Sequence, residues 1–154
     1  MSGRFIRLLA WALTASYWIV LFVVTHLPPR NLPQVGVSDK TLHFACYALL
    51  AAGLYACFWL TRFSTLRTTL YVTLLLWVYG AVDELLQIPV GRSADIRDWF
   101  ADASGALTGV CVMTLVRVVV EKCRGSTVGG NPTDETRMTN EIRMTESEWS
   151  RKPE

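Results

Sequence analysis

The 154-residue sequence is poor in charge and has no recognisable metal-binding cysteine pattern. Charged residues make up 18% of it, whereas an ordinary soluble domain has about 25%. Its net charge of +2 is too small to indicate a nucleic-acid partner, so no nucleic-acid binding is expected. The four cysteines form no Cys-x-x-Cys or Cys/His spacing, so we interpret them as small apolar side chains rather than zinc ligands.

Hydrophobic residues are abundant instead, at 51%, and they are grouped in long runs. A helix needs about 20 apolar residues to cross a hydrocarbon core of about 30 Å. Runs of this kind cover residues 8–25, 41–61 and 68–88, and a fourth is long enough when extended to about 98–120. The first run exceeds the usual core of a signal peptide, about 7–15 residues, and "HLPPRNLP" after it offers no small-x-small cleavage site. We therefore expect it to remain as a helix.

These runs predict an all-α, polytopic membrane protein with four transmembrane helices in residues 1–122. Residues 123–154 are polar and charged, with too little apolar surface to fold alone, so a disordered C-terminal tail is expected. Short loops on the cytoplasmic side of a membrane are enriched in basic residues. More basic residues lie on the side of the termini, which predicts that both termini are cytoplasmic. Basic residues on that side are Arg4, Arg7, Arg62, Arg67, Lys122 and Arg124, against Arg30, Lys40, Arg92 and Arg97 on the other.

Gly105 and Gly109 form a small-xxx-small pair in the fourth run. Such pairs allow two helices to approach closely in lipid. Packing within the chain is favoured over a homodimer interface, and the oligomeric state stays open.

Polar residues gather at the helix ends that this topology places on the outer side of the membrane. His43 and Tyr47 share one helix face, and Glu84 and Gln87 share another, because their spacings are four and three residues. Ionisable groups are costly inside a membrane, so they either pair with one another or form a functional site. The residues concerned are His26, Asp39, Lys40, His43, Tyr47, Asp83, Glu84, Gln87, Arg92, Asp95, Asp98 and Asp102.

Three motifs, "THLPP" (25–29), "SDKTLHFACYALL" (38–50) and "YGAVDELLQIPVGRSADIRDWFADASGALTG" (79–109), resemble the VanZ-like family of small bacterial membrane proteins. The resemblance covers roughly residues 8–120. It implies a multi-pass protein of the bacterial plasma (inner) membrane in a cell-envelope context, and the founding member is associated with low-level teicoplanin resistance. Two positions depart from the family pattern: Val90 separates Pro89 from Gly91, and Asp102 stands where Asn is frequent.

One hypothesis is an envelope enzyme that acts on a lipid-linked or amphiphilic substrate in the outer leaflet. His43, Glu84 and Asp98 are the candidate catalytic residues, since imidazole and a partly desolvated carboxyl can transfer protons near neutral pH. Candidate substrate-binding residues are Lys40, Tyr47, Gln87 and Arg92, with His26, Asp39, Asp83, Asp95 and Asp102 in the surrounding polar network. A variant adds a divalent cation on the carboxylates of Glu84, Asp95, Asp98 and Asp102, or zinc with His43.

Two alternatives stay open beside the enzyme. The first is a non-enzymatic protein that binds an anionic envelope lipid or an amphiphilic drug. The second is a small proton-coupled transporter with Asp83, Glu84 and His43 as a relay, although no internal repeat is visible. Membrane lipids are the expected partners under all three hypotheses. The structural alternative is that the polar cluster is a network of ion pairs that only stabilises the fold.

Overall fold

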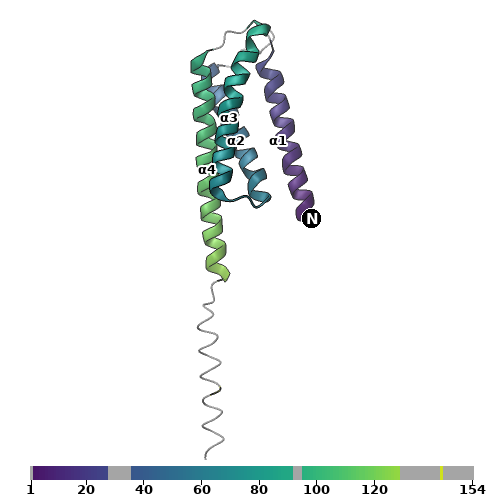
Figure 1. Cartoon of the computed structure of the whole chain (residues 1–154), viewed down its shortest axis with the longest axis vertical. Helices are drawn as coiled ribbons and strands as arrows, with labels where there is room; N and C mark the ends of the chain where they lie inside the picture. The colour runs from purple at the N-terminus through teal and green to yellow at the C-terminus, as the bar shows by residue number, and fades with distance from the viewer. Residues whose placement is uncertain (1, 28–35, 92–94, 129–142, 144–154) are drawn as a thin grey trace, which may run out of the picture. The chain divides into compact units, whose positions relative to one another are not determined.

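The computed structural model describes residues 2–27, 36–91, 95–128 and 143 (Figure 1). Its helices are α1 (Gly3–Thr25), α2 (Asp39–Leu60), α3 (Thr65–Gln87) and α4 (Ile96–Val128), with a short 3-10 turn η2 (Ile88–Val90) after α3. All four α-helices are long and apolar enough to cross a membrane, and the described residues contain no strand. The predicted all-α class with four transmembrane helices is confirmed.

Local sequence explains where the helices begin and end at the polar end of the fold. Ser38 precedes α2, and its Oγ accepts a hydrogen bond from the backbone N–H of Thr41 at 3.2 Å, as an N-cap does. Pro89 lies in η2, and its missing N–H prevents the helix from continuing. Gly91 closes this turn with φ at 81°, a left-handed conformation that glycine adopts without strain. The bend after α3 is therefore encoded locally.

The fourth helix is longer than its apolar run. It begins at Ile96 and ends at Val128, whereas the sequence suggested about 98–120. An ion pair of 2.8 Å between Arg117 Nε and Glu121 Oε1, one helical turn apart, supports its polar continuation. Residues 123–128, assigned above to the polar tail, are thus helical, and the rest of that tail apart from Arg143 lies outside the described residues. The chain divides into two compact units, residues 1–116 and 117–154.

The first unit has apolar side chains on its outside and polar ones within. Leu8, Ile19, Val78 and Leu115 are 63–64% exposed. Tyr47, Leu50, Leu54, Tyr55, Val72, Leu76, Ala106 and Val110 form its apolar core, while the side chains of Asp83, Glu84, Gln87 and Asp102 are also buried. Carboxylates are rarely buried in soluble proteins, but in membrane proteins ionisable groups face the bundle interior. This arrangement agrees with a protein surrounded by lipid.

The two glycines of α4 pack against the backbone of α2. A Cβ at Gly105 would overlap the carbonyl group of Phe44, and one at Gly109 would overlap the carbonyl oxygen of Ala48. The absence of side chains therefore allows the two helices to touch, as small-xxx-small pairs do in membranes. The expectation that this pair serves packing within the chain is confirmed.

Two tryptophans join α3 to α4 near the same end. The indole N–H of Trp99 donates to the carbonyl of Trp77 at 3.0 Å, and the indole N–H of Trp77 donates to the carbonyl of Ala103 at 3.2 Å. On the other side of α2, the hydroxyl of Tyr17 in α1 donates to the carbonyl of Cys46 at 3.1 Å. These links hold the helix ends that carry the polar residues.

Candidate functional site

A buried imidazole and a buried carboxylate meet between α2 and α4. His43 Nδ1 lies 2.9 Å from Asp102 Oδ1, and the two residues are 7% and 0% exposed. When Asp102 is ionised, its oxygen can only accept, so Nδ1 carries the proton and Nε2 carries the lone pair. His43 Nε2 lies 3.9 Å from Asp39 Oδ2, one helical turn earlier. The pair therefore fixes the orientation of an imidazole whose second nitrogen is available for proton transfer.

Glu84 from α3 completes the buried cluster. Its Oε2 accepts the backbone N–H of Asp95 at 3.1 Å, which ties the end of α3 to the chain just before α4. Its Oε1 is buried and has no hydrogen-bond partner among the described residues, and the same holds for Asp102 Oδ2 and the hydroxyl of Tyr47. Buried polar atoms usually have partners. Several unsatisfied atoms at one place indicate a site that binds something.

An ionic cluster lies at the edge of this site. Lys40 Nζ lies 2.7 Å from Asp98 Oδ1 and 3.4 Å from Asp95 Oδ2, so α2 and the start of α4 are joined by one ammonium group. The backbone N–H of Arg97 donates to Asp95 Oδ1 at 2.9 Å. This hydrogen bond, together with Lys40, holds the pKa of the Asp95 carboxyl below its usual range. These contacts join the start of α2 to the start of α4.

A second polar network surrounds Asp83, which neighbours Glu84 in the sequence. Asp83 is 1% exposed and accepts hydrogen bonds from the hydroxyl of Tyr79 at 3.2 Å and the amide of Gln87 at 3.1 Å. His26 Nδ1, at the end of α1, lies 3.9 Å from Asp83 Oδ1. This network has its own donors and is separate from the unsatisfied atoms beside His43.

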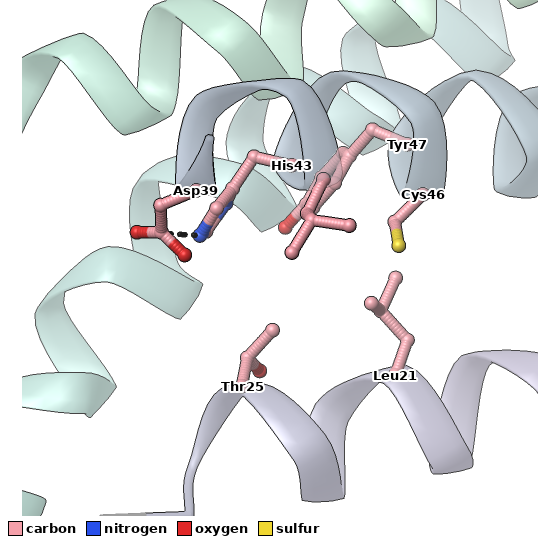
Figure 2. A pocket seen from close by; sticks show the side chains of 7 residues that line it. Leu21, Thr25, Asp39, His43, Cys46 and Tyr47 are labelled. Carbon is pink, nitrogen blue, oxygen red and sulfur yellow. Dashed lines mark ion pairs between the residues drawn. The ribbon is translucent and has the colours of Figure 1, made fainter. Parts of the chain in front are cut away.

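Two pockets adjoin the cluster. A cavity of about 70 Å³ is lined by α2 residues that include Asp39, His43 and Tyr47, and by Leu21 and Thr25 of α1. Figure 2 shows the side chains of α2 directed toward Leu21 and Thr25. A larger pocket, of about 460 Å³, lies between α3 and α4 and is lined by Ala81, Glu84, Leu85, Asp95, Ile96 and Trp99. It places apolar side chains beside the carboxyl group of Glu84.

Two overlapping groups of side chains have donor atoms close enough to share a metal ion. One consists of His43, Glu84 and Asp102, all buried, and the other of Asp39, His43 and Asp98. In each group one donor atom per residue lies within 4.8 Å of the others. Asp39 has 56% of its side chain exposed, and Asp98 already pairs with Lys40.

The residues singled out in the sequence lie at one end of the first unit. His43, Tyr47, Glu84 and Asp102 form the buried cluster, with Asp39, Lys40, Asp95 and Asp98 at its edge and His26, Asp83 and Gln87 in the adjacent network. Arg92, the expected counter-ion or anion-binding residue, lies outside the described residues. Sequence reasoning did not single out Tyr79, Trp77 or Trp99. The four-residue spacing of Tyr79 and Asp83 could have identified the first of them.

Comparison with known proteins agrees with this architecture. The family described as VanZ/LLP1 matches residues 5–117, which include α2 and α3, most of α1 and α4, and nearly every residue of the first unit. The chain matches no curated protein and no solved structure. The family match, the four apolar helices and the motifs around His43 and Glu84 all indicate the same family. The chain belongs to the VanZ-like family of multi-pass membrane proteins.

Proposed function

We propose that this protein is an enzyme of the bacterial plasma membrane that acts on an amphiphilic, lipid-linked substrate of the cell envelope. The observation that carries the proposal is the buried hydrogen bond between His43 and Asp102 beside the unsatisfied carboxyl oxygen of Glu84. Structural ion-pair lattices satisfy their members, whereas catalytic clusters keep groups available for substrate. The unsatisfied atoms therefore favour a reaction site over a lattice.

The chemistry available to these residues is proton transfer. Asp102 orients His43, as the third member of a nucleophile–base–acid arrangement orients its base, and leaves Nε2 as general base. Glu84 is the candidate general acid, since its Oε1 is held within the same cluster without a partner among the described residues. Asp98, also a candidate catalytic residue, holds Lys40. Tyr47 lines the smaller cavity beside His43, and Gln87 donates to Asp83.

The pocket between α3 and α4 supports an amphiphilic substrate. Its lining joins the carboxyl groups of Glu84 and Asp95 to the apolar side chains of Leu85, Ile96 and Trp99. A polar head group can lie at Glu84 while an acyl or isoprenoid chain follows the apolar wall into the surrounding lipid. Lys40 and Arg92 are the candidate groups for an anionic head group, because ammonium and guanidinium bind phosphate and carboxylate.

The orientation and the biological setting belong to the same proposal. We place both termini in the cytoplasm and the cluster in the outer leaflet, since basic residues prevail on the side of the termini. A change to the lipid-linked substrate would alter the target of teicoplanin-type glycopeptides, which links the proposal to the resistance associated with the founding member of the family.

The test uses the purified protein in vesicles made from a total lipid extract of bacterial envelopes. Mass spectrometry of the lipids after incubation is expected to show a species that wild-type protein produces and His43→Ala and Glu84→Gln do not. Ser104→Ala, at an exposed position of α4, is the matched control and is expected to retain the conversion. Circular dichroism and size-exclusion chromatography establish that each variant is folded.

Other results would replace the enzyme by one of its alternatives. A lipid that co-purifies unchanged with wild type, and is lost in Lys40→Ala but kept in His43→Ala, would identify a binding protein. Proton movement across the vesicle membrane that depends on Asp83 and Glu84, with no new lipid, would identify a transporter.

A further inference from the structure

Three side chains from three different helices direct metal-ligating atoms to one buried point. They are His43 of α2, Glu84 of α3 and Asp102 of α4, with one donor atom each, and these atoms lie within 4.8 Å of one another. Their exposures are 7%, 6% and 0%. The convergence depends on the packing of the helices, since no two of these residues belong to the same helix.

The atoms at this point lack the partners that such burial requires. Asp102 Oδ2 and Glu84 Oε1 are buried without a hydrogen-bond partner among the described residues, and so is the hydroxyl of Tyr47. Both carboxyl groups belong to side chains that are more than nine-tenths buried. Each carboxylate has one partnered oxygen, at His43 or at the backbone N–H of Asp95, and a second oxygen left unpartnered is costly in an apolar interior.

The nearest ammonium group does not balance these charges. Lys40 Nζ is engaged by Asp98 at 2.7 Å and by Asp95 at 3.4 Å, at the edge of the site. Among the described groups at this point only His43 can be positively charged, and its single charge balances one of the two carboxylates. A divalent cation bound to a neutral imidazole and two carboxylates gives a neutral site.

We infer that His43, Glu84 and Asp102 bind one divalent transition-metal ion. One imidazole nitrogen with two carboxylates is a donor set that suits Zn²⁺ or Mn²⁺, whereas Mg²⁺ and Ca²⁺ prefer oxygen alone. The 2.9 Å separation of His43 Nδ1 and Asp102 Oδ1 suits two ligands of one ion, which replaces the proton of their hydrogen bond. Asp39, 3.9 Å from His43 Nε2, lies where it can orient the imidazole.

The second group, Asp39, His43 and Asp98, is the weaker candidate. Its carboxylate at Asp39 is largely exposed, and its carboxylate at Asp98 is neutralised by Lys40. It lacks the unsatisfied buried oxygens that distinguish the inner group. Asp98→Asn therefore distinguishes the two groups, because it removes a carboxylate of the outer group and none of the inner one.

The metal site would add a metal ion to the proposed enzyme. The part of the metal in the reaction rests on the proposed function, whereas metal binding does not. Three protein ligands leave a coordination position for water, whose pKa a catalytic zinc ion lowers to about 7. With the metal bound, the water would serve as the general base in place of His43, which would then be a metal ligand. Metal binding itself can be measured without any substrate.

The experiment titrates the chelator-treated protein in detergent with Zn²⁺ or Mn²⁺ alone, followed by calorimetry and elemental analysis. One equivalent per chain is expected for wild type and for Asp98→Asn. His43→Ala, Glu84→Gln and Asp102→Asn are each expected to lose at least tenfold in affinity. Pulsed electron paramagnetic resonance of the Mn²⁺-loaded wild type is expected to show coupling to an imidazole nitrogen, a result that does not depend on whether a variant folds.

Three outcomes would overturn the inference: no binding by wild type, no imidazole coupling, or a loss in Asp98→Asn equal to that in Glu84→Gln. Lipid conversion that persists after removal of metal would overturn the metal's part in the reaction, while the proposed enzyme would stand. Metal binding with the predicted variant pattern but without lipid conversion would support the metal site and count against the enzyme.

Discussion

His43 and Asp102 are separated by 59 residues in the sequence and by 2.9 Å in the structure, and both are buried. The pair joins the second turns of two helices, α2 and α4, at the end of the bundle where the polar residues gather. Because each residue would be costly to bury alone, the effect of changing one depends on what remains of the other.

Asp102→Ala and Asp102→Asn are expected to differ in stability. Alanine leaves the imidazole N–H of His43 buried without its acceptor, which costs about 1–3 kcal/mol, whereas asparagine supplies an acceptor oxygen and costs less. Unfolding in detergent by a denaturant, followed by circular dichroism, measures both free energies. In combination with His43→Ala, the double-mutant cycle is expected to show coupling of about 0.5–3 kcal/mol. Additive effects of the two substitutions would contradict the contact.

Gly105→Ala is expected to destabilise the protein although alanine is the better helix former. Its Cβ would overlap the carbonyl group of Phe44, so α2 and α4 must separate, and overpacking of this kind costs about 1–3 kcal/mol. Gly125→Ala is the matched control, because nothing lies within 4 Å of a Cβ at that helical position. The control is expected to be neutral or stabilising by up to about 1 kcal/mol. A lower thermal midpoint for Gly105→Ala alone supports the helix contact, and equal midpoints would contradict it.

Trp99→Phe is expected to weaken the connection between α3 and α4. Phenylalanine keeps an aromatic ring but loses the N–H that donates to the carbonyl of Trp77 at 3.0 Å, a net loss of about 0.5–1.5 kcal/mol. Trp11→Phe provides the comparison, since Trp11 packs its ring edge-on against Phe58 and makes no indole hydrogen bond within the described part of the chain. The denaturant midpoint should fall further for Trp99→Phe. The reverse order would show that ring area, rather than the hydrogen bond, joins these helices.

The predicted topology can be measured with single cysteines and a membrane-impermeant maleimide in intact bacterial cells. In a chain without its four native cysteines, Val37→Cys lies before α2 and Ser64→Cys before α3, and both positions are exposed. With both termini in the cytoplasm, Val37→Cys should be labelled in intact cells, and Ser64→Cys should be labelled after lysis alone. The opposite pattern would invert the topology and move the polar site to the cytoplasmic side.

The sequence predicts the spans and the meeting of their polar ends well, because long uncharged runs admit few arrangements in a bilayer. It does not predict which polar residues pair. Asp83 and Glu84 are neighbours, but successive residues of a helix point about 100° apart. Asp83 therefore joins Tyr79 and Gln87, while Glu84 contacts the backbone of Asp95. That division depends on how α3 is rotated within the bundle, which a single sequence does not specify.

The contact of Gly105 with Phe44 also has a consequence for the chemistry. Phe44 follows His43 directly, and Asp102 lies three residues before Gly105, so this close contact of the two helix backbones is about one turn from the imidazole–carboxylate pair. The separation of His43 and Asp102 therefore depends on the absence of a side chain at position 105. A larger residue at position 105 is expected to push α2 and α4 apart and to lengthen the contact between His43 and Asp102 without altering any polar group of the site.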